Sequence, residues 1–147
     1  MKHFLFIAAA ALLLTSCYYK TDSPRGSWAK GCDLSWLSEM EHDSMFRYDC
    51  IDSLRSMSMN AVRLRVWVNH STGWSNKDDM LSLAKRAAKA GQRIMIDIHY
   101  SDFFADPHRQ DIPMEWREYD YEMLCEAVRV HTLDILGTLK EEGIRPE

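Results

Sequence analysis

One segment of the chain alternates between aliphatic side chains and polar or aromatic ones. In residues 61–69 (AVRLRVWVN) every second side chain is aliphatic, and Arg63, Arg65 and Trp67 fall between them. Side chains on a strand alternate between its faces, so the pattern predicts a β-strand with one aliphatic face. Because a guanidinium is costly to bury alone, Arg63 and Arg65 predict carboxylates or a polar cavity opposite them. A half-exposed antiparallel strand with a charged outer face is the alternative.

A second alternating segment ends in side chains that are common in functional sites. In residues 93–99 (RIMIDIH) the isoleucines occupy one face, while Asp97 and His99 share the other face with Met95. The loop after this segment adds three candidates: Ser101, Asp102 and Phe104. This arrangement is typical of a barrel strand that places Asp97 and His99 in the interior and the loop residues at the mouth. Asp97 is then a candidate partner for the two arginines.

Helical periodicity and end signals predict three helices around these strands. The first covers residues 49–58, with Asp49 as its cap and Cys50, Leu54 and Met57 on its apolar stripe. The second covers residues 78–90, and the third covers residues 121–142 with Leu124, Val128, Ile135 and Leu139 in register. A first strand is predicted at residues 28–33, and a loop rich in Ser, Glu and Asp follows it.

The resulting order of strand, helix, strand, helix, strand, helix predicts an α/β fold with a parallel sheet and right-handed crossovers. Three such units cannot close a (β/α)8 TIM barrel, which has eight strands. We therefore expect the N-terminal part of a TIM barrel, present as about three βα units.

The N-terminus has the features of a bacterial lipoprotein signal. Lys2 and His3 precede an apolar run over residues 4–14, which is followed by Thr15, Ser16 and Cys17. The run is shorter than the roughly 20 residues that span a bilayer. We expect residues 1–17 to be a signal peptide whose Cys17 is lipidated, residues 18–27 to be a tether, and residues 28–147 to form the barrel part. The expected location is the bacterial cell envelope, lipid-anchored and facing the periplasm or the cell surface; secretion is the alternative.

Composition narrows the possible partners. The chain has 18 basic and 22 acidic residues and a net charge of −4, which gives no reason to expect nucleic acid as a partner. Besides Cys17, the cysteines Cys32, Cys50 and Cys125 form neither a disulfide framework nor a zinc pattern. We expect them to be small core residues or to form one incidental pair, and we expect no metal and no cofactor.

Three sequence blocks together resemble one family. They are WAKGCDLS at residues 28–35, VRLRVWVN at residues 62–69 and HYSDFFADP at residues 99–107. In this order they resemble the arabinogalactan endo-β-1,4-galactanases of glycoside hydrolase family 53, over nearly all of residues 28–147. The resemblance implies a TIM barrel, and it implies an endo-acting, retaining glycosidase that cleaves β-1,4-galactan in pectic side chains.

Retaining hydrolysis needs two carboxylates about 5–5.5 Å apart. The resemblance places the acid/base glutamate in an Asn-Glu pair at the end of strand four and the nucleophilic glutamate at the end of strand seven. Neither position occurs in this chain, and Glu147 precedes the expected fourth strand. We therefore expect a truncated chain without galactanase activity.

The resemblance also implies residues that contact the substrate. Arg65, His99 and Asp102 would line the sugar site, and Trp67 and Trp116 would offer aromatic surface to the galactan. The chain departs from the family pattern at three positions: Phe104 replaces a tryptophan, Cys32 replaces a small residue, and Ser58 replaces a glycine at the end of the first helix.

Two other functions compete with this interpretation. A metal-dependent hydrolase would use Asp97 and His99 as ligands, although Arg63 and Arg65 would repel a nearby cation. A non-catalytic, carbohydrate-binding surface lipoprotein derived from the barrel would lack the same catalytic glutamates.

Overall fold

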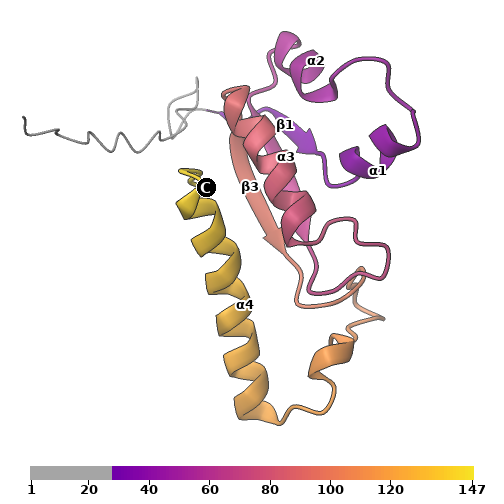
Figure 1. Cartoon of the computed structure of the whole chain (residues 1–147), viewed down its shortest axis with the longest axis vertical. Helices are drawn as coiled ribbons and strands as arrows, with labels where there is room; N and C mark the ends of the chain where they lie inside the picture. Colours follow the sequence, from indigo (N-terminus) through magenta and orange to yellow (C-terminus); the bar gives the residue numbers. More distant parts are fainter. Residues whose placement is uncertain (1–27) are drawn as a thin grey trace, which may run out of the picture.

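The computed structural model describes residues 28–147 (Figure 1). Its three-stranded sheet has the order β1 (Gly31–Asp33), β2 (Ala61–Val66) and β3 (Arg93–Ile98). The helices are α1 (Leu37–His42), α2 (Cys50–Ser56), α3 (Lys77–Lys89), the 3₁₀ helix η1 (Met114–Trp116) and α4 (Tyr121–Glu141). The predicted signal peptide, with Cys17, and the predicted tether lie outside these residues. From residue 28 onward, no helix is long and apolar enough to cross a membrane.

The strand order confirms the predicted βα alternation. Both pairs of neighbouring strands are parallel, and the register places Arg65 opposite Asp97 and Arg63 opposite both Asp33 and Met95. β1 begins three residues later than predicted, at Gly31. The backbone N–H of Lys30 donates to the Asn60 side chain at 2.8 Å and its carbonyl accepts from the Asn60 N–H at 2.8 Å, so Lys30 already contacts the neighbouring segment, and the regular strand pairing starts at Gly31.

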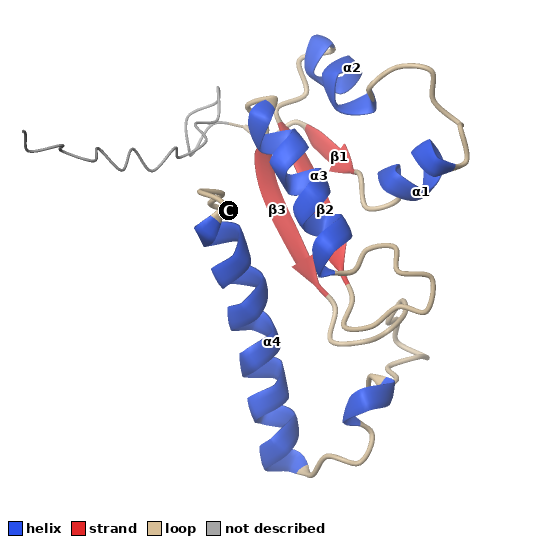
Figure 2. Ribbon diagram, viewed as in Figure 1, coloured by secondary structure: helices blue, strands red, loops and turns tan. Residues whose placement is uncertain are grey.

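The aliphatic face of the sheet packs against α3, which lies in front of the strands and runs along them in Figure 2. On β2 the side chains of Val62, Leu64 and Val66 are each at most 2% exposed. They pack in one cluster with side chains of α3: Met80, Leu83, Ala84 and Ala87. Each large aliphatic side chain buried in this way stabilises the fold by about 1.5–3 kcal/mol. The predicted aliphatic and polar faces are therefore confirmed, and the polar face is left for a site.

The loop predicted between the first strand and the first helix contains a helix. α1 forms there because Leu37 is 2% exposed and anchors one side, while Glu41 binds Arg86 of α3. This prediction was wrong because a one-turn amphipathic pattern is too short to recognise by periodicity. The predicted stripe of α2 was partly wrong: Ile51 is its buried residue, and Met57 is 57% exposed.

α4 packs through only one half of its length. Ile135 and Leu139 are buried as predicted, whereas Leu124 and Val128, nearer its start, are only half-buried. Beyond α4 the chain returns to the outer edge of β3, where the Glu147 N–H donates to the Ile94 carbonyl at 2.9 Å. Glu147 therefore occupies the position from which a further parallel strand would start alongside β3.

A charged junction joins α1, α2 and α3. The Arg86 guanidinium donates to both Glu41 oxygens, at 2.7 and 2.8 Å, and to Asp49 Oδ2 at 3.0 Å. As predicted, Asp49 caps α2, and its Oδ1 accepts from the Ile51 N–H at 2.8 Å. Burial alone would raise the pKa of Asp49, but the hydrogen bonds from Arg86 and from the backbone of Asp52 and Ile51 lower it below its ordinary value.

We expect part of the chain's stability to disappear in acid because of Asp49. A carboxyl whose pKa is lower in the folded chain stabilises the fold above its unfolded pKa, about 3.9, and this contribution is lost as the pH falls through the folded pKa. Asp49 is partly exposed, so solvent screening limits the contribution to about 1 kcal/mol or less. The free energy of unfolding, measured with urea, should therefore change less between about pH 6 and pH 3 in Asp49→Asn than in the unaltered chain.

Asp49→Ala separates the effect of the Asp49 charge on stability from the effect of its capping hydrogen bond. Asn still offers a capping oxygen, whereas Ala offers none, so Asp49→Ala should be less stable than Asp49→Asn by roughly 1 kcal/mol at both pH values. Equal pH dependence in Asp49→Asn and the unaltered chain would show that the Asp49 charge contributes nothing.

Candidate active-site face

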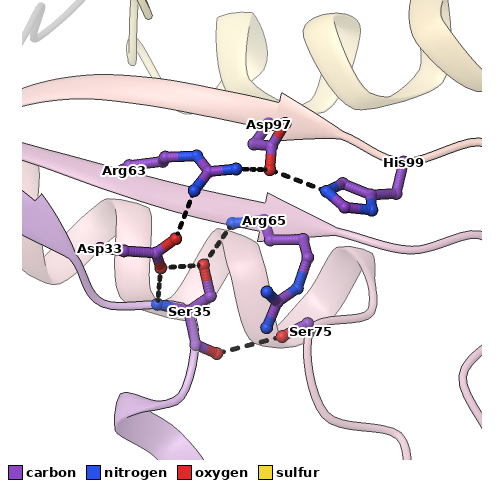
Figure 3. Close-up of polar contacts among 7 residues, drawn as sticks. All are labelled: Asp33, Ser35, Arg63, Arg65, Ser75, Asp97 and His99. Atoms are coloured by element: carbon purple, nitrogen blue, oxygen red, sulfur yellow. Dashed lines mark hydrogen bonds and ion pairs between the residues drawn. The ribbon is translucent and has the colours of Figure 1, made fainter. Parts of the chain in front are cut away.

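The polar face of the sheet carries a row of charged side chains near the carboxyl ends of the strands (Figure 3). Arg63 Nη1 donates to Asp33 Oδ2 on β1 at 2.8 Å, and Arg63 Nη2 binds Asp97 Oδ2 on β3. The prediction that Asp97 lies beside an arginine of the second strand is confirmed. One guanidinium thus bridges carboxylates from both neighbouring strands, so the row ties all three strands together on the polar face.

His99 extends this row toward the mouth. Its Nε2 lies 2.8 Å from Asp97 Oδ2, the same oxygen that binds Arg63. A carboxylate accepts hydrogen bonds, so this contact assigns the ring hydrogen to Nε2. In the neutral ring, Nδ1 is then left as an acceptor for a hydroxyl group.

The turn after β1 is fastened to β2 through Ser35. Ser35 Oγ donates to Asp33 Oδ1 at 2.5 Å and accepts from the backbone N–H of Arg65 at 2.8 Å. The carbonyl of Ser35 accepts from Ser75 Oγ at 3.0 Å, which adds the loop before α3. These bonds fix the backbone on both sides of Arg65.

Arg65 is buried among aromatic rings. The residue is 4% exposed. Its guanidinium carbon lies 4.9 Å from the ring centre of Trp36, 4.2 Å from that of Trp67 and 4.3 Å from that of Phe104. Within residues 28–147, its Nε and Nη2 have no hydrogen-bond partner. Burial lowers the pKa of Arg65, and the nearby carboxylates Asp33 and Asp97 oppose that shift.

The prediction was that carboxylates or a polar cavity lie opposite both arginines, and its carboxylate alternative is confirmed for Arg63 only. Arg63 takes both available carboxylates, and Arg65 stacks on rings instead. A guanidinium can do this because it is planar and weakly hydrated, so its faces pack on aromatic rings while its edge N–H groups stay available.

The two tryptophans predicted to offer aromatic surface are both buried. Trp67 is 1% exposed and stacks on His70 with 4.4 Å between ring centres, and Trp116 is 7% exposed and contacts the edge of His131. Neither presents a free ring face in this structure, because His70 covers Trp67 and Trp116 packs against His131 of α4. Trp36, which the sequence analysis did not single out, is 42% exposed.

Asp102 ties two loops together. Its Oδ1 accepts from the Asn69 N–H at 2.9 Å, and its Oδ2 accepts from the Met114 N–H at 2.8 Å. It shapes the mouth by joining the loops after β2 and β3, and its predicted contact with substrate stays a prediction.

Asp33 and Ser35 also belong to this face, although the sequence analysis missed their roles. A signal was present, since Asp33 ends the first strand as Asp97 nears the end of the third, and a serine two residues after an aspartate commonly bonds back to it. No group of three or more His, Cys, Asp or Glu side chains that could hold a metal ion lies among the residues from 28 to 147. Asp97 binds both His99 and Arg63.

Comparison with known proteins supports the family suggested by the sequence blocks. The profile of glycosyl hydrolase family 53 matches residues 29–147. The chain is 35% identical over 126 residues to arabinogalactan endo-β-1,4-galactanase A of Emericella nidulans, with 80% of this chain and 36% of that protein covered. It is 31% identical over 148 residues to the arabinogalactan endo-β-1,4-galactanase of Cellvibrio japonicus, with 95% and 39% covered.

A solved structure from a study of two fungal β-1,4-galactanases gives the same result. It superposes with a TM-score of 0.74 at 34% identity, and the match covers 80% of this chain and 37% of that one. The chain spans about a third of the length of the curated relatives it matches. Its three parallel strands and their helices correspond to part of the TIM barrel of these enzymes. The chain belongs to glycosyl hydrolase family 53.

Proposed function

We propose that this chain forms part of the substrate-binding face of an endo-acting, retaining β-1,4-galactanase. The observation that carries the proposal is Arg65, a buried guanidinium whose Nε and Nη2 lack partners within the described residues. Leaving such donors unpaired costs about 1–3 kcal/mol or more. That cost is offset when an oxygen-rich ligand or a catalytic carboxylate accepts from them.

The row of Asp33, Arg63, Asp97 and His99 positions one more group toward such a ligand. Asp97, which Arg63 binds, holds His99 by its Nε2, and this leaves Nδ1 to accept from a sugar hydroxyl. Asp33 and Asp97 are occupied by Arg63 and by their neighbours, so neither is free to act as the acid or the nucleophile of a retaining mechanism. The part proposed for this chain is therefore recognition and orientation of galactan.

The test is binding of β-1,4-galactotetraose by the full chain, followed by calorimetry or by changes in its NMR spectrum. Cellotetraose is the matched control, because its glucose units differ from galactose in the configuration at C4. We expect galactotetraose to bind and cellotetraose to bind more weakly, and we expect no release of shorter oligosaccharides from galactan. Equal binding of the two sugars, or binding of neither, would contradict the proposal. Hydrolysis by the purified chain would contradict the assignment of catalysis to glutamates outside it.

A further inference from the structure

Trp36 is an exposed aromatic residue at the same end of the sheet as Arg65. It follows β1, is 42% exposed, and has its ring 4.9 Å from the Arg65 guanidinium carbon. Its ring lies 5.6 Å from that of Phe104 at an angle of 36° and meets Trp67 edge-on. Trp36 occupies the N-cap position of α1, yet its side chain makes no capping bond. Neither the core nor the helix start requires an indole there.

Arg65 supplies an independent sign of a ligand beside this ring. The residue is 4% exposed, and two of its guanidinium nitrogens have no partner in the described part of the chain. Carboxylates cannot reach it from this sheet, because Asp33 and Asp97 already bind Arg63. The place therefore combines a partly exposed aromatic ring with unused hydrogen-bond donors.

Pyranose sugars suit this combination. One face of a β-galactose unit presents C–H bonds that pack on an aromatic ring, and its edges carry hydroxyl and ring oxygens that accept hydrogen bonds. A peptide or nucleotide ligand would also bring charge or a second ring, and Phe103, the exposed ring next to Phe104, already packs against Trp67, His70 and Arg109.

We propose that Trp36 is a sugar-stacking residue, whose indole packs against the C–H face of one galactose unit while Arg65 donates to that unit's oxygens. The inference rests on the proposed function and adds to it the residue that would hold one sugar ring in place. Phe104 supports the indole from the side and limits how far it can turn.

The experiment titrates the full chain with β-1,4-galactotetraose and follows the indole N–H signals in NMR spectra. The chain has five tryptophans, so substitutions assign each signal. In the unaltered chain we expect the Trp36 signal to shift on binding and the Trp28 signal to stay. Trp36→Ala should weaken binding by about tenfold, and Trp36→Phe, which keeps a ring, by less.

Trp28→Ala is the matched control, because Trp28 is 88% exposed and lies before β1, at the far end of the strand from the mouth. Its affinity should equal that of the unaltered chain. If the unaltered chain binds and its Trp36 signal does not move, or if Trp36→Ala binds equally well, the inference is wrong and the proposed function stands. If the unaltered chain binds no galactotetraose, the proposed function itself fails.

Discussion

Gly31→Ala is expected to detach β1 from the sheet. A Cβ at this position would lie 2.2 Å from the Ala61 carbonyl oxygen and 2.7 Å from its carbon, both backbone atoms of β2. Gly31 pairs with Ala61, so the clash falls on the ladder itself. Backbone atoms cannot turn away as a flexible side chain can, and β1 has to move. Overpacking a well-fitted site typically costs about 1–3 kcal/mol, and we expect a loss at the upper end of that range.

Gly137→Ala is the matched control for this substitution. Gly137 lies within α4, and a Cβ there meets no atom within 4 Å. Alanine favours a helix over glycine by about 1 kcal/mol, so this variant should be more stable than the unaltered chain. Urea unfolding of the unaltered chain and of the two variants tests the expected loss of stability and the expected gain. Equal midpoints for Gly31→Ala and the unaltered chain would show that β1 and β2 are not in close contact.

Arg65→Met is expected to stabilise the chain and, under the proposed function, to weaken the binding of galactotetraose. The substitution removes a buried charge whose donors are unpaired among residues 28–147, and methionine fills a similar volume between the rings. Stacking on three rings offsets part of the cost of burial, by up to about 2 kcal/mol. Replacing a buried charge by an apolar residue is often neutral or stabilising by 1–4 kcal/mol, and we expect a gain of about 1 kcal/mol.

Arg63→Met, on the same strand and face, should instead destabilise the chain. It would leave Asp33 and Asp97 without the cation that bridges them, so their carboxylates would repel each other. The Arg63 side chain is 44% exposed, and solvent screening keeps the expected loss near 1 kcal/mol. Thermal unfolding of both variants tests these two expected changes in stability. A destabilised Arg65→Met chain would mean that the aromatic stacking outweighs the unpaired donors.

The sequence predicted the faces of the strands more reliably than the surroundings of single side chains. The alternation in residues 61–69 and 93–99 placed Arg63, Asp97 and His99 on one face, because a strand leaves a side chain only two directions. The same rule could not say which arginine takes the carboxylates. That depends on Asp33 and on the rings of Trp36 and Phe104, which come from segments distant in the sequence.

The surroundings of the aromatic side chains were also poorly predicted from the sequence. Trp67 and Trp116 were predicted to offer ring surface because the family resemblance implied it. Whether a ring is open or covered depends on loop packing: His70 covers Trp67, and His131 lies against Trp116. Such contacts form only once the loops after β2 and β3 are held in place, which Asp102 achieves through two backbone bonds.

The arginine bridge between Asp33 and Asp97 has a consequence for how this sheet can diverge over evolutionary time. Each of the three residues belongs to a different strand, and the loss of Arg63 would leave two neighbouring carboxylates without their cation, whereas the loss of one aspartate would leave a neutral ion pair. Replacing Arg63 first therefore passes through a less stable intermediate, whereas replacing one aspartate first need not. Descendant sequences should keep Arg63 for as long as they keep both aspartates, so that position 63 is constrained by residues 33 and 97, which lie far apart in the chain.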